Sequence, residues 1–452
     1  MLKHYCGANV AALILVFAQV ACAAAKEAGP EEYRQALKTL QPGDTLRLRS
    51  GVYREGLPLH RLSGTADAPI VIEGPADGPA AVFLARAGHN TVSIVDARHV
   101  TVRNLELDGT NLPVDGVKCE GHAAWAHHIT LENLSIHGHG NNQQTVGIST
   151  KCPAWNWVIR DNRIVGAGTG IYLGNSDGSA PFVAGLIEHN LIVDTQGYNL
   201  QIKHQKPRPE LPGMPDEPST TIIRHNVFSK EHGEPGGPMA RPNVLLGHWP
   251  LAGAGRDDYY QVYGNFFYDN PTEALFQGEG NIALHHNVFW NPRGDAVRIQ
   301  PHNDVPKQIV VAYNTVLAKG AGIAVRNREG RAQHAQIAAA NAVFAASPVV
   351  GIKEDSNVSA SLAQAEVYLT RPLAPPGVFD PRPLPGRLQL RKDVRAALPA
   401  WPGLDVDFDG QPHRLPVAGA YGSVGPAWLP RLERKPAPSA AAGSVQEIGK
   451  AK

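Results

Sequence analysis

The chain has 452 residues, with 42 Lys and Arg against 41 Asp and Glu, so its formal net charge is +1. This balance excludes the strongly basic surface that nucleic-acid binding usually needs, and an apolar content of 43% excludes disorder of the whole chain. Charged residues make up only 18%, while glycine and proline number 46 and 37, which favours a β-rich protein with many turns.

The first 25 residues are predicted to be an export signal. Lys3 and His4 form a short basic start, residues 10–20 are apolar, and residues 21–25 offer small-residue cleavage sites. The apolar run is shorter than the roughly 20 residues that span a bilayer, and no later stretch is long enough, so we expect no stable membrane insertion. A periplasmic or secreted protein is predicted. A lipoprotein anchored at Cys22 is the less favoured alternative, because Gln19 stands where a Leu-like residue is expected.

Cys119 and Cys152 are the two cysteines that remain after the predicted signal. An oxidising compartment permits a disulfide, and two is the right number for one bond. The sequence does not show how far apart the two residues lie, so it leaves open whether they are bonded.

A repeat dominates the body of the chain, after a short helix expected over residues 31–40. Each unit is a short strand, a turn and a second strand with the signature x-Asn-x-apolar. Nine asparagines recur at intervals of 22 to 39 residues: Asn104, Asn133, Asn162, Asn190, Asn226, Asn265, Asn287, Asn314 and Asn341. A period of this size predicts stacked supersecondary units.

One asparagine per unit predicts an amide ladder at a corner of the stack. The side chain both donates and accepts hydrogen bonds, and asparagine tolerates the left-handed conformation that a corner needs. Stacked strands lie about 4.8 Å apart, so the amides of successive units can bond one another. Because the strands need a partner above and below, and helical periodicity is absent for long over residues 60–350, we predict an all-β solenoid, a parallel β-helix.

With these repeats the chain resembles the right-handed parallel β-helices of the pectate-lyase-like superfamily, over about residues 40–350. Residues 42–56 (PGDTLRLRSGVYREG) and 63–75 (SGTADAPIVIEGP) are similar to the opening of chondroitinase B-type and alginate-lyase β-helices. Residues 405–422 (DVDFDGQPHRLPVAGAYG) are similar to the closing segment of secreted β-helix proteins. The chain lacks the Asn-Gly-x-Glu and Lys-Ser-Ser patterns of that lyase family and the Asp-Pro-His-Asp pattern of alginate epimerases. The resemblance therefore implies the fold and leaves the reaction open.

Aligning the strand that precedes each asparagine strand predicts an outer face. Alternate apolar residues should point inward, so the residues between them form columns along the solenoid. One predicted column contains Lys118, Ser149, Tyr172, Gln201, Leu245, Phe276 and Arg298. The next contains Glu120, Lys151, Gly174, Lys203, Gly247, Gly278 and Gln300, and the strand ends add Asn175, His204, His248 and Glu279.

A substrate groove is predicted around Lys203, because glycines flank it in its column. Three insertions, residues 204–220, 231–242 and 249–258, are expected to form its walls. The superfamily usually acts on acidic polysaccharides, and β-elimination at a uronate needs a base of lowered pKa and cations at the carboxylate. The predicted roles are Lys203 as base, His248 as acid or base partner, Arg298 as carboxylate clamp, and Tyr172, Gln201, His204, Phe276 and Glu279 in substrate binding.

Other functions are compatible with the same face. A uronate epimerase would use the same base and clamp as a polysaccharide lyase. A glycoside hydrolase needs two carboxyl groups about 5 to 9.5 Å apart, and Glu120 and Glu279 are five rungs apart, although Asp177, Asp257 or Asp258 could reach in from loops. The last alternative is a non-catalytic glycan-binding or envelope-scaffold protein, on whose surface Lys203 would serve solubility alone.

No metal-ligand set is predicted. Ca²⁺ is common in the superfamily and stays open through the resemblance, but it needs clustered carboxylates and the mapped face has only Glu120 and Glu279. No Cys/His spacing typical of zinc sites occurs in the sequence.

The C-terminal quarter of the chain differs in character from the repeat. The β-helix is predicted over residues 26–350, and residues 351–425 lose the asparagine signature and gain proline-rich turns, so we expect an irregular cap packed on the last coils. Residues 426–452 end in a stretch rich in Ala, Ser and Lys and are expected to be a disordered tail. A monomer is expected.

Overall fold

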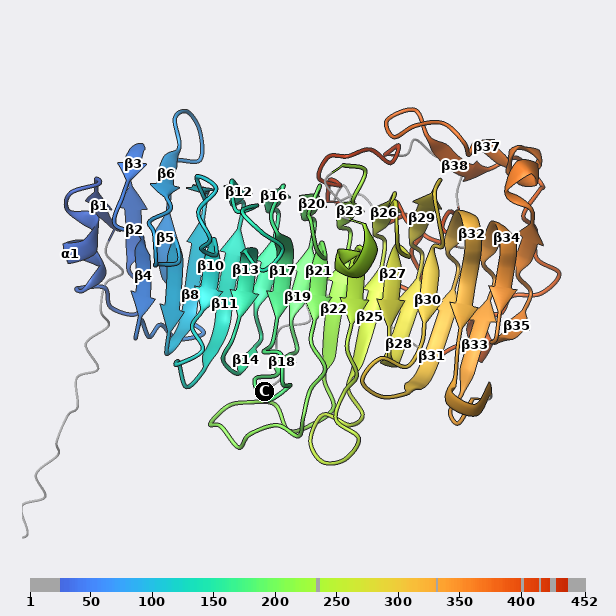
Figure 1. Ribbon diagram of the computed structural model, residues 1–452, viewed down its shortest axis with the longest axis horizontal. Helices are drawn as coiled ribbons and strands as arrows, with labels where there is room; N and C mark the ends of the chain where they lie inside the picture. Colours follow the sequence, from blue (N-terminus) through green and yellow to red (C-terminus); the bar gives the residue numbers. More distant parts are fainter. Residues whose placement is uncertain are drawn as a thin grey trace, which may run out of the picture.

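The computed structural model describes residues 25–232, 236–330, 332–399, 402–413, 416–422 and 428–437. Figure 1 shows one elongated solenoid in which the strands of successive coils lie side by side. The predicted export signal, except for Ala25, lies outside the described residues, as does the end of the predicted tail. No helix among the described residues is long and apolar enough to cross a membrane.

The coils build three parallel ladders, which we call A, B and C. Ladder A contains β1 (Ala25–Ala28), β2 (Thr45–Leu48), β5 (Ile70–Glu73), β8 (Ala97–Arg103), β11 (Ala126–Glu132), β15 (Val158–Arg160), β19 (Leu186–Glu188), β22 (Thr220–Arg224), β25 (Tyr259–Tyr263), β28 (Gly280–His285), β31 (Pro306–Ala312), β33 (Gln336–Ala339) and β35 (Lys353–Asp355). Two short strands, β14 (Ala154–Trp155) and β18 (Phe182–Val183), extend it at one corner.

Ladders B and C run beside it and merge at the last coils. Ladder B contains β3 (Gly51–Tyr53), β6 (Ala81–Leu84), β9 (Leu105–Asp108), β12 (Ser135–His137), β16 (Arg163–Val165), β20 (Leu191–Val193), β23 (Val227–Ser229), β26 (Phe266–Tyr268), β29 (Val288–Asn291), β32 (Thr315–Val325), β34 (Ala342–Val350) and β36 (Val358–Ala360). Ladder C contains β4 (Leu57–His60), β7 (Val92–Val95), β10 (Val117–Cys119), β13 (Val146–Thr150), β17 (Thr169–Leu173), β21 (Leu200–Ile202), β24 (Val244–Leu246), β27 (Phe276–Gly278), β30 (Val297–Ile299) and the second halves of β32 and β34. Within the described residues, the connections between these strands are loops, except for α1 (Tyr33–Leu37) between β1 and β2 and the short helices η1 (Gly237–Met239) and η2 (Arg328–Gly330).

The inside of the coils is one apolar core that runs the length of the solenoid. In ladder C, Ile148 pairs with Ile171 and Ile171 with Leu200, so like residues stack from coil to coil, as the alternation predicts. All three are fully buried. The parallel β-helix predicted from the sequence is confirmed.

The register differs from the prediction at β27. Leu245 pairs with Gln277, and Val244 pairs with Phe276, which is fully buried in the core. Gln277 therefore takes the outward place predicted for Phe276. The sequence pattern is ambiguous here because Leu275 and Phe276 are adjacent, apolar and both buried, so alternation does not tell which of them occupies the ladder position.

The asparagine ladder is continuous through the later coils. Each side-chain amide donates to the Oδ1 of the next at 2.9–3.0 Å, through Asn162, Asn190, Asn226, Asn265, Asn287, Asn314, Asn341 and Asn357. Asn357 is an additional rung.

Two of the nine predicted asparagines have a different place. Asn104 and Asn133 themselves adopt the left-handed conformation, with φ of 57° and 50°, and Leu134 holds the ladder position below Asn162. From Asn162 onward the left-handed residue is the one before the asparagine, such as Asp161 or His189. In the early coils the asparagine itself adopts the left-handed conformation and its side-chain bond to Asn104 is exposed, whereas in the later coils the asparagine follows the left-handed residue and its side-chain bonds are buried.

Both ends of the described part of the chain pack on the solenoid. Helix α1 (Tyr33–Leu37), shorter than the range predicted for it, lies at the first coils with Tyr33 and Leu37 buried in the core. The C-terminal segment, residues 361–437, contains η3 (Leu362–Val367), β37 (Leu369–Arg371), β38 (Asp380–Pro383) and η4 (Arg395–Ala397). It runs back along the outside of ladder B (Figure 1). Phe379 of this segment stacks on Phe266 and Trp290.

Candidate functional site

A groove of about 600 Å³ lies on the outer face of ladder C. Its floor contains Tyr172 of β17 and Gln201 of β21, which pair in register, and Lys118 of β10. Lys151 and Lys203 follow directly on β13 and β21. Parallel stacking therefore brings residues far apart in sequence onto one surface, which we call the ladder C groove.

The walls of the groove come from the turns that lead into ladder C. Residues 142–145 precede β13, Tyr198 precedes β21, and Arg241 belongs to the predicted insertion 231–242. In the same wall the Gln143 amide donates to the carbonyl of Met239 at 2.7 Å, which ties this insertion to the turn beside it. The other two predicted insertions meet elsewhere: Arg208 pairs with Asp258 where both are buried.

The ladder C groove is strongly cationic. Lys118, Lys151, Lys203 and Arg241 line it, and Asp115 is the single carboxylate among its lining residues. That carboxylate is already engaged. Its Oδ1 accepts from the Val146 amide at 2.9 Å, and its Oδ2 accepts from the Ser149 hydroxyl at 3.0 Å and lies 3.5 Å from Lys118 Nζ. The remaining positive charge suits an anionic ligand.

Lys151 is the most perturbed cation of the groove. Its pKa is lowered to about 8, mainly by burial and in smaller part by the charges of Lys118 and Lys203, while Asp115 works in the opposite direction. Its Nζ lies 3.4 Å from the centre of the Tyr172 ring. The aromatic face attracts the ammonium form, and the lowered pKa means that the neutral amine makes up about half of Lys151 near pH 8.

Lys203 lies two coils along in the same column as Lys151, with Gly174 between them. Burial lowers the pKa of Lys203 as well, while Glu279 works to raise it. A methyl group at position 174 would lie 3.2 Å from the Lys203 Cβ, and Gly174 has φ of 91°, so a side chain is disfavoured there on both counts. The glycine leaves the two amines without a side chain between them.

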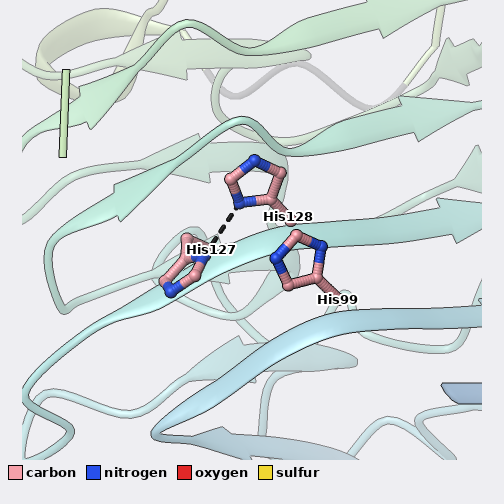
Figure 2. A group of neighbouring side chains, drawn as sticks. All are labelled: His99, His127 and His128. Atoms are coloured by element: carbon pink, nitrogen blue, oxygen red, sulfur yellow. Dashed lines mark hydrogen bonds between the residues drawn. The ribbon is translucent and has the colours of Figure 1, made fainter. Parts of the chain in front are cut away.

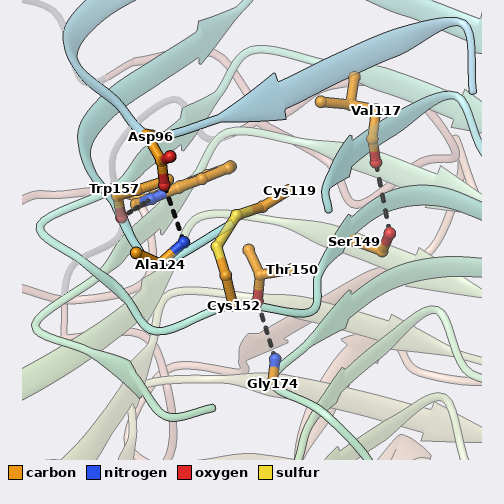
Figure 3. The surroundings of a disulfide bond; sticks show 10 residues. Asp96, Val117, Cys119, Ala124, Ser149, Thr150, Cys152, Trp157 and Gly174 are labelled. Atoms are coloured by element: carbon orange, nitrogen blue, oxygen red, sulfur yellow. Dashed lines mark hydrogen bonds between the residues drawn. A yellow bond between two sulfur atoms is a disulfide. The ribbon is translucent and has the colours of Figure 1, made fainter. Parts of the chain in front are cut away.

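A disulfide anchors the backbone beside Lys151. Cys119 at the end of β10 and Cys152 after β13 are bonded and buried, which answers the question that the sequence left open (Figure 3). The Lys151 amide donates to the Cys119 carbonyl at 2.9 Å, and the Thr150 hydroxyl accepts from the Gly174 amide at 2.8 Å. Two successive coils are thus joined covalently at the edge of the groove.

Three of the predicted site residues, Tyr172, Gln201 and Lys203, line the ladder C groove. His204 and His248 lie next to each other, with ring centres 5.4 Å apart, but are not among the lining residues. The His248 Nδ1 bonds the Trp249 carbonyl at 2.7 Å, and burial lowers the pKa of His204. The predicted catalytic roles of Lys203 and His248 stay predictions.

The other three predicted site residues lie away from the groove. Phe276 is a core residue because of the register at β27, so its predicted place against a sugar ring is wrong. Glu279 is fully buried, and its carboxylate accepts the backbone amides of residues 302–304, so it holds a turn. Arg298 pairs with Asp295 and lies three coils beyond Gln201, about 14 Å by strand spacing.

Sequence reasoning missed the importance of Lys118, Lys151 and Arg241. The two lysines stood in the predicted columns and Arg241 in a predicted wall, but nothing in the sequence separates them from solubilising side chains. Their burial and their shared cavity depend on how the turns at residues 142–145 and 236–242 lie over the strand face.

Comparison with protein-family models gives no match for this chain, and comparison with curated protein sequences gives none. Among solved structures, an alginate lyase from Paenibacillus sp. strain FPU-7 is similar over 75% of this chain and 99% of its own, with 17% identity and a TM-score of 0.38. The catalytic unit of a GH87 α-1,3-glucanase from Streptomyces thermodiastaticus is similar over 76% of this chain and 69% of its own, with 12% identity and a TM-score of 0.47. The A-module of the Azotobacter vinelandii mannuronan C-5 epimerase is similar over 73% of this chain and 89% of its own, with 13% identity and a TM-score of 0.39. These likenesses extend to the parallel β-helix alone.

Proposed function

We propose that the ladder C groove binds a uronate-containing polysaccharide and that the protein is a lyase that cleaves it by β-elimination. The observation that supports this most is the charge of the groove, in which four cations face one carboxylate that is already bonded. An extended polyanion suits such a groove because it crosses several coils in succession, from Lys118 to Gln201.

Lys151 is the residue we propose as the base. β-Elimination removes the proton α to the uronate carboxylate, and a neutral amine with a pKa of about 8 can accept that proton near physiological pH. Lys118 and Lys203 would neutralise the carboxylate and the enolate that forms from it. Lys203, the base predicted from the sequence, is the second candidate for the proton acceptor, since burial lowers its pKa as well.

Tyr172 is suited to complete the reaction. When the double bond forms, the bond to the 4-linked oxygen breaks and that oxygen takes a proton. Burial raises the pKa of the Tyr172 phenol, so it stays protonated and can donate. Because Lys151 occupies one face of its ring, stacking of a sugar on that face would displace the proposed base.

The rival hydrolase has less support from this groove. Glycoside hydrolysis needs a pair of carboxyl groups across the scissile bond, about 5 to 9.5 Å apart. Among the lining residues only Asp115 carries one, and it is held by Val146, Ser149 and Lys118. A retaining or inverting pair would have to be completed by a residue outside the groove.

The test follows the ultraviolet absorbance of the unsaturated uronate that elimination produces. Purified protein is incubated with alginate, pectate, chondroitin, heparosan and glucuronan, with and without Ca²⁺. We expect an absorbance rise with one of them, its loss in Lys151→Gln, and a strong decrease in Tyr172→Phe. The matched control is Lys319→Gln, which removes an exposed lysine elsewhere on the solenoid and should leave the rate unchanged.

The outcomes separate the candidate functions. A rise that is abolished by Lys203→Gln and kept by Lys151→Gln would move the base to Lys203. Deuterium uptake from heavy water at the uronate carbon, without any absorbance rise, would indicate an epimerase. Retention of the polysaccharides with neither signal would leave a glycan-binding protein, and equal turnover in both lysine variants would contradict the proposed site.

A further inference from the structure

Three histidines meet at a corner of the solenoid in ladder A. His99 belongs to β8, and His127 and His128 belong to β11 of the next coil (Figure 2). Each offers one ring nitrogen, and these three atoms lie within 4.8 Å of one another. None of the three is among the residues that line the ladder C groove, so the proposed lyase function does not use them.

The register of the two strands explains why the histidines converge. Ala126 pairs with Ala97 and Ile129 with Val100, so His128 stands directly over His99. Both residues are left-handed, with φ of 49° for His99 and 52° for His128, and the backbone turns at this point. Their rings stack with centres 4.3 Å apart. Two non-glycine residues at one corner thus adopt the left-handed conformation, and each of them costs conformational free energy.

The neighbours of His127 fix its ring. His127 is only 9% exposed, it stacks on Trp155 with centres 4.5 Å apart, and Trp125 lies 5.0 Å away on the same measure. Its Nδ1 is 2.8 Å from the Nδ1 of His128. On the far side of His128, the Asn156 amide lies 3.1 Å from Nε2. A turn of that amide lets its oxygen accept from Nε2–H, the outer partner that metal-bound histidines usually have.

Burial also disfavours the imidazolium form of the three rings. Burial, with contributions from the neighbouring histidines, lowers the pKa of His127 and of His128 to about 4, and burial lowers that of His99. One Nδ1 of the His127–His128 pair carries the proton of their hydrogen bond, and a shift of that proton to the other nitrogen of the same ring frees both Nδ1 lone pairs for an ion. Arg98 is the charged group that faces them and counts against a bound cation, although its guanidinium donates to the Ser63 hydroxyl at 2.7 Å.

We propose that His99, His127 and His128 form a binding site for a divalent transition metal ion such as Zn²⁺ or Cu²⁺. Imidazole nitrogens suit these ions, and three of them leave further coordination positions for water or another ligand. An ion about 2.1 Å from both Nδ1 atoms of the adjacent pair would make an angle of about 85° with them, close to the right angle of tetragonal sites. His99 and His128 are partly exposed, which gives the ion a way in.

Titration calorimetry of the untagged protein with Zn²⁺ tests the site. We expect the wild type to bind one ion tightly per chain. We expect His99→Asn and His128→Asn each to weaken Zn²⁺ binding by about 100-fold, because loss of a ligand should cost at least as much affinity as loss of a residue that only hydrogen-bonds a ligand. Asparagine is a conservative choice because Asn156 holds the equivalent left-handed position of the next coil, with φ of 53°. The control is His334→Asn, which removes an exposed histidine. Arg98→Gln should tighten binding.

Tryptophan fluorescence supplies a second measurement. A Cu²⁺ ion at this corner lies close to Trp155 and Trp125, so it should quench part of the emission at one equivalent, and the two asparagine variants should lose this effect. Circular dichroism checks that the variants are folded. Zn²⁺ binding and Cu²⁺ quenching that are unchanged in folded His99→Asn and His128→Asn would overturn the proposal, as would the absence of any one-equivalent binding to the wild type.

Discussion

A lysine can act as a base near neutral pH only where its surroundings disfavour the charged form. At Lys151 burial is the main cause, and the charges of Lys118 and Lys203 add to it. We therefore expect kcat/KM of the proposed lyase reaction to rise with pH up to about 8 and then level off. In Lys118→Gln one of the repelling charges is gone, so the midpoint should move to higher pH. A midpoint that is identical in the two proteins would contradict this account.

The same pKa shift predicts how stability depends on pH. Between about 8 and the ordinary value of 10.5, the unfolded chain keeps its Lys151 proton while the folded protein releases it, so the free energy of unfolding rises with pH across this window. Lys151→Met lacks the group and the effect. We expect the difference in stability between variant and wild type to shift in favour of the wild type from pH 8 to 10.5. Denaturant unfolding at several pH values measures it.

Single residues also mark the limit of prediction from sequence. Alternation correctly placed Ile148, Ile171 and Leu200 inside and Tyr172 outside, because each is flanked by residues of the opposite kind or by glycine. It failed at Phe276, where two adjacent apolar residues make the register ambiguous. Burial of a lysine amine is not encoded in its own strand at all, since it depends on turns contributed by other coils.

At the scale of one structural element, the ladder asparagines are expected to dominate stability. The Asn226 side chain donates to the Ile187 carbonyl and to Asn265 Oδ1, and its Oδ1 accepts from the Asn190 amide, all buried. Asn226→Ala leaves those groups without partners, which we expect to cost about 3 kcal/mol or more.

Thermal unfolding of the wild type, Asn226→Ala and Asn133→Gly measures the stability that is lost at Asn226. The matched control is Asn133→Gly, which keeps the left-handed backbone at an exposed corner and removes two exposed side-chain bonds, one to Asn104 and one from Arg434. A loss as small in Asn226→Ala as in Asn133→Gly would show that the buried bonds add little.

The disulfide ties the coil of β10 to that of β13. It closes a loop of 33 residues, for which chain entropy predicts about 3–4 kcal/mol of stabilisation. We expect the double variant Cys119→Ala, Cys152→Ala to unfold at a lower temperature by an amount similar to that caused by reduction of the wild type. If a reducing agent lowered the stability of the double variant as much as that of the wild type, the loss on reduction would not come from the disulfide.

The regular elements were predictable because every coil has the same two requirements. The backbone polar groups of its turn need hydrogen-bond partners, and each of its strands needs a neighbouring strand to pair with. The histidine corner was not predictable, because its ligands are one coil apart. His99 and His127 are separated by 28 residues, far from any short metal motif. The signal that could have found them is the coil period itself, applied to histidine as it was to asparagine.

At the scale of the whole molecule, the C-terminal segment joins distant coils. Arg434 donates to Asn133 Oδ1 at 2.8 Å, the Lys435 carbonyl accepts from His189 Nδ1 at 2.9 Å, and Lys435 Nζ donates to the Gly264 carbonyl at 2.9 Å. We expect deletion of residues 428–452 to lower the melting temperature and to increase binding of a hydrophobic dye, because part of the apolar outside of ladder B becomes exposed. Deletion of residues 438–452 removes none of these contacts and is the control. If the two deletion variants had the same melting temperature and the same dye binding, residues 428–437 would not contribute to stability.

The asparagine ladder has a consequence for how such a chain can change over evolution. Neighbouring ladder residues are separated by as few as 16 and as many as 39 residues, yet their amide bonds stay at 2.9 and 3.0 Å. A fixed bond at one corner lets the rest of a coil gain or lose whole loops without shifting the strands that follow. New surface chemistry can therefore be acquired one coil at a time, while the inherited scaffold stays in register.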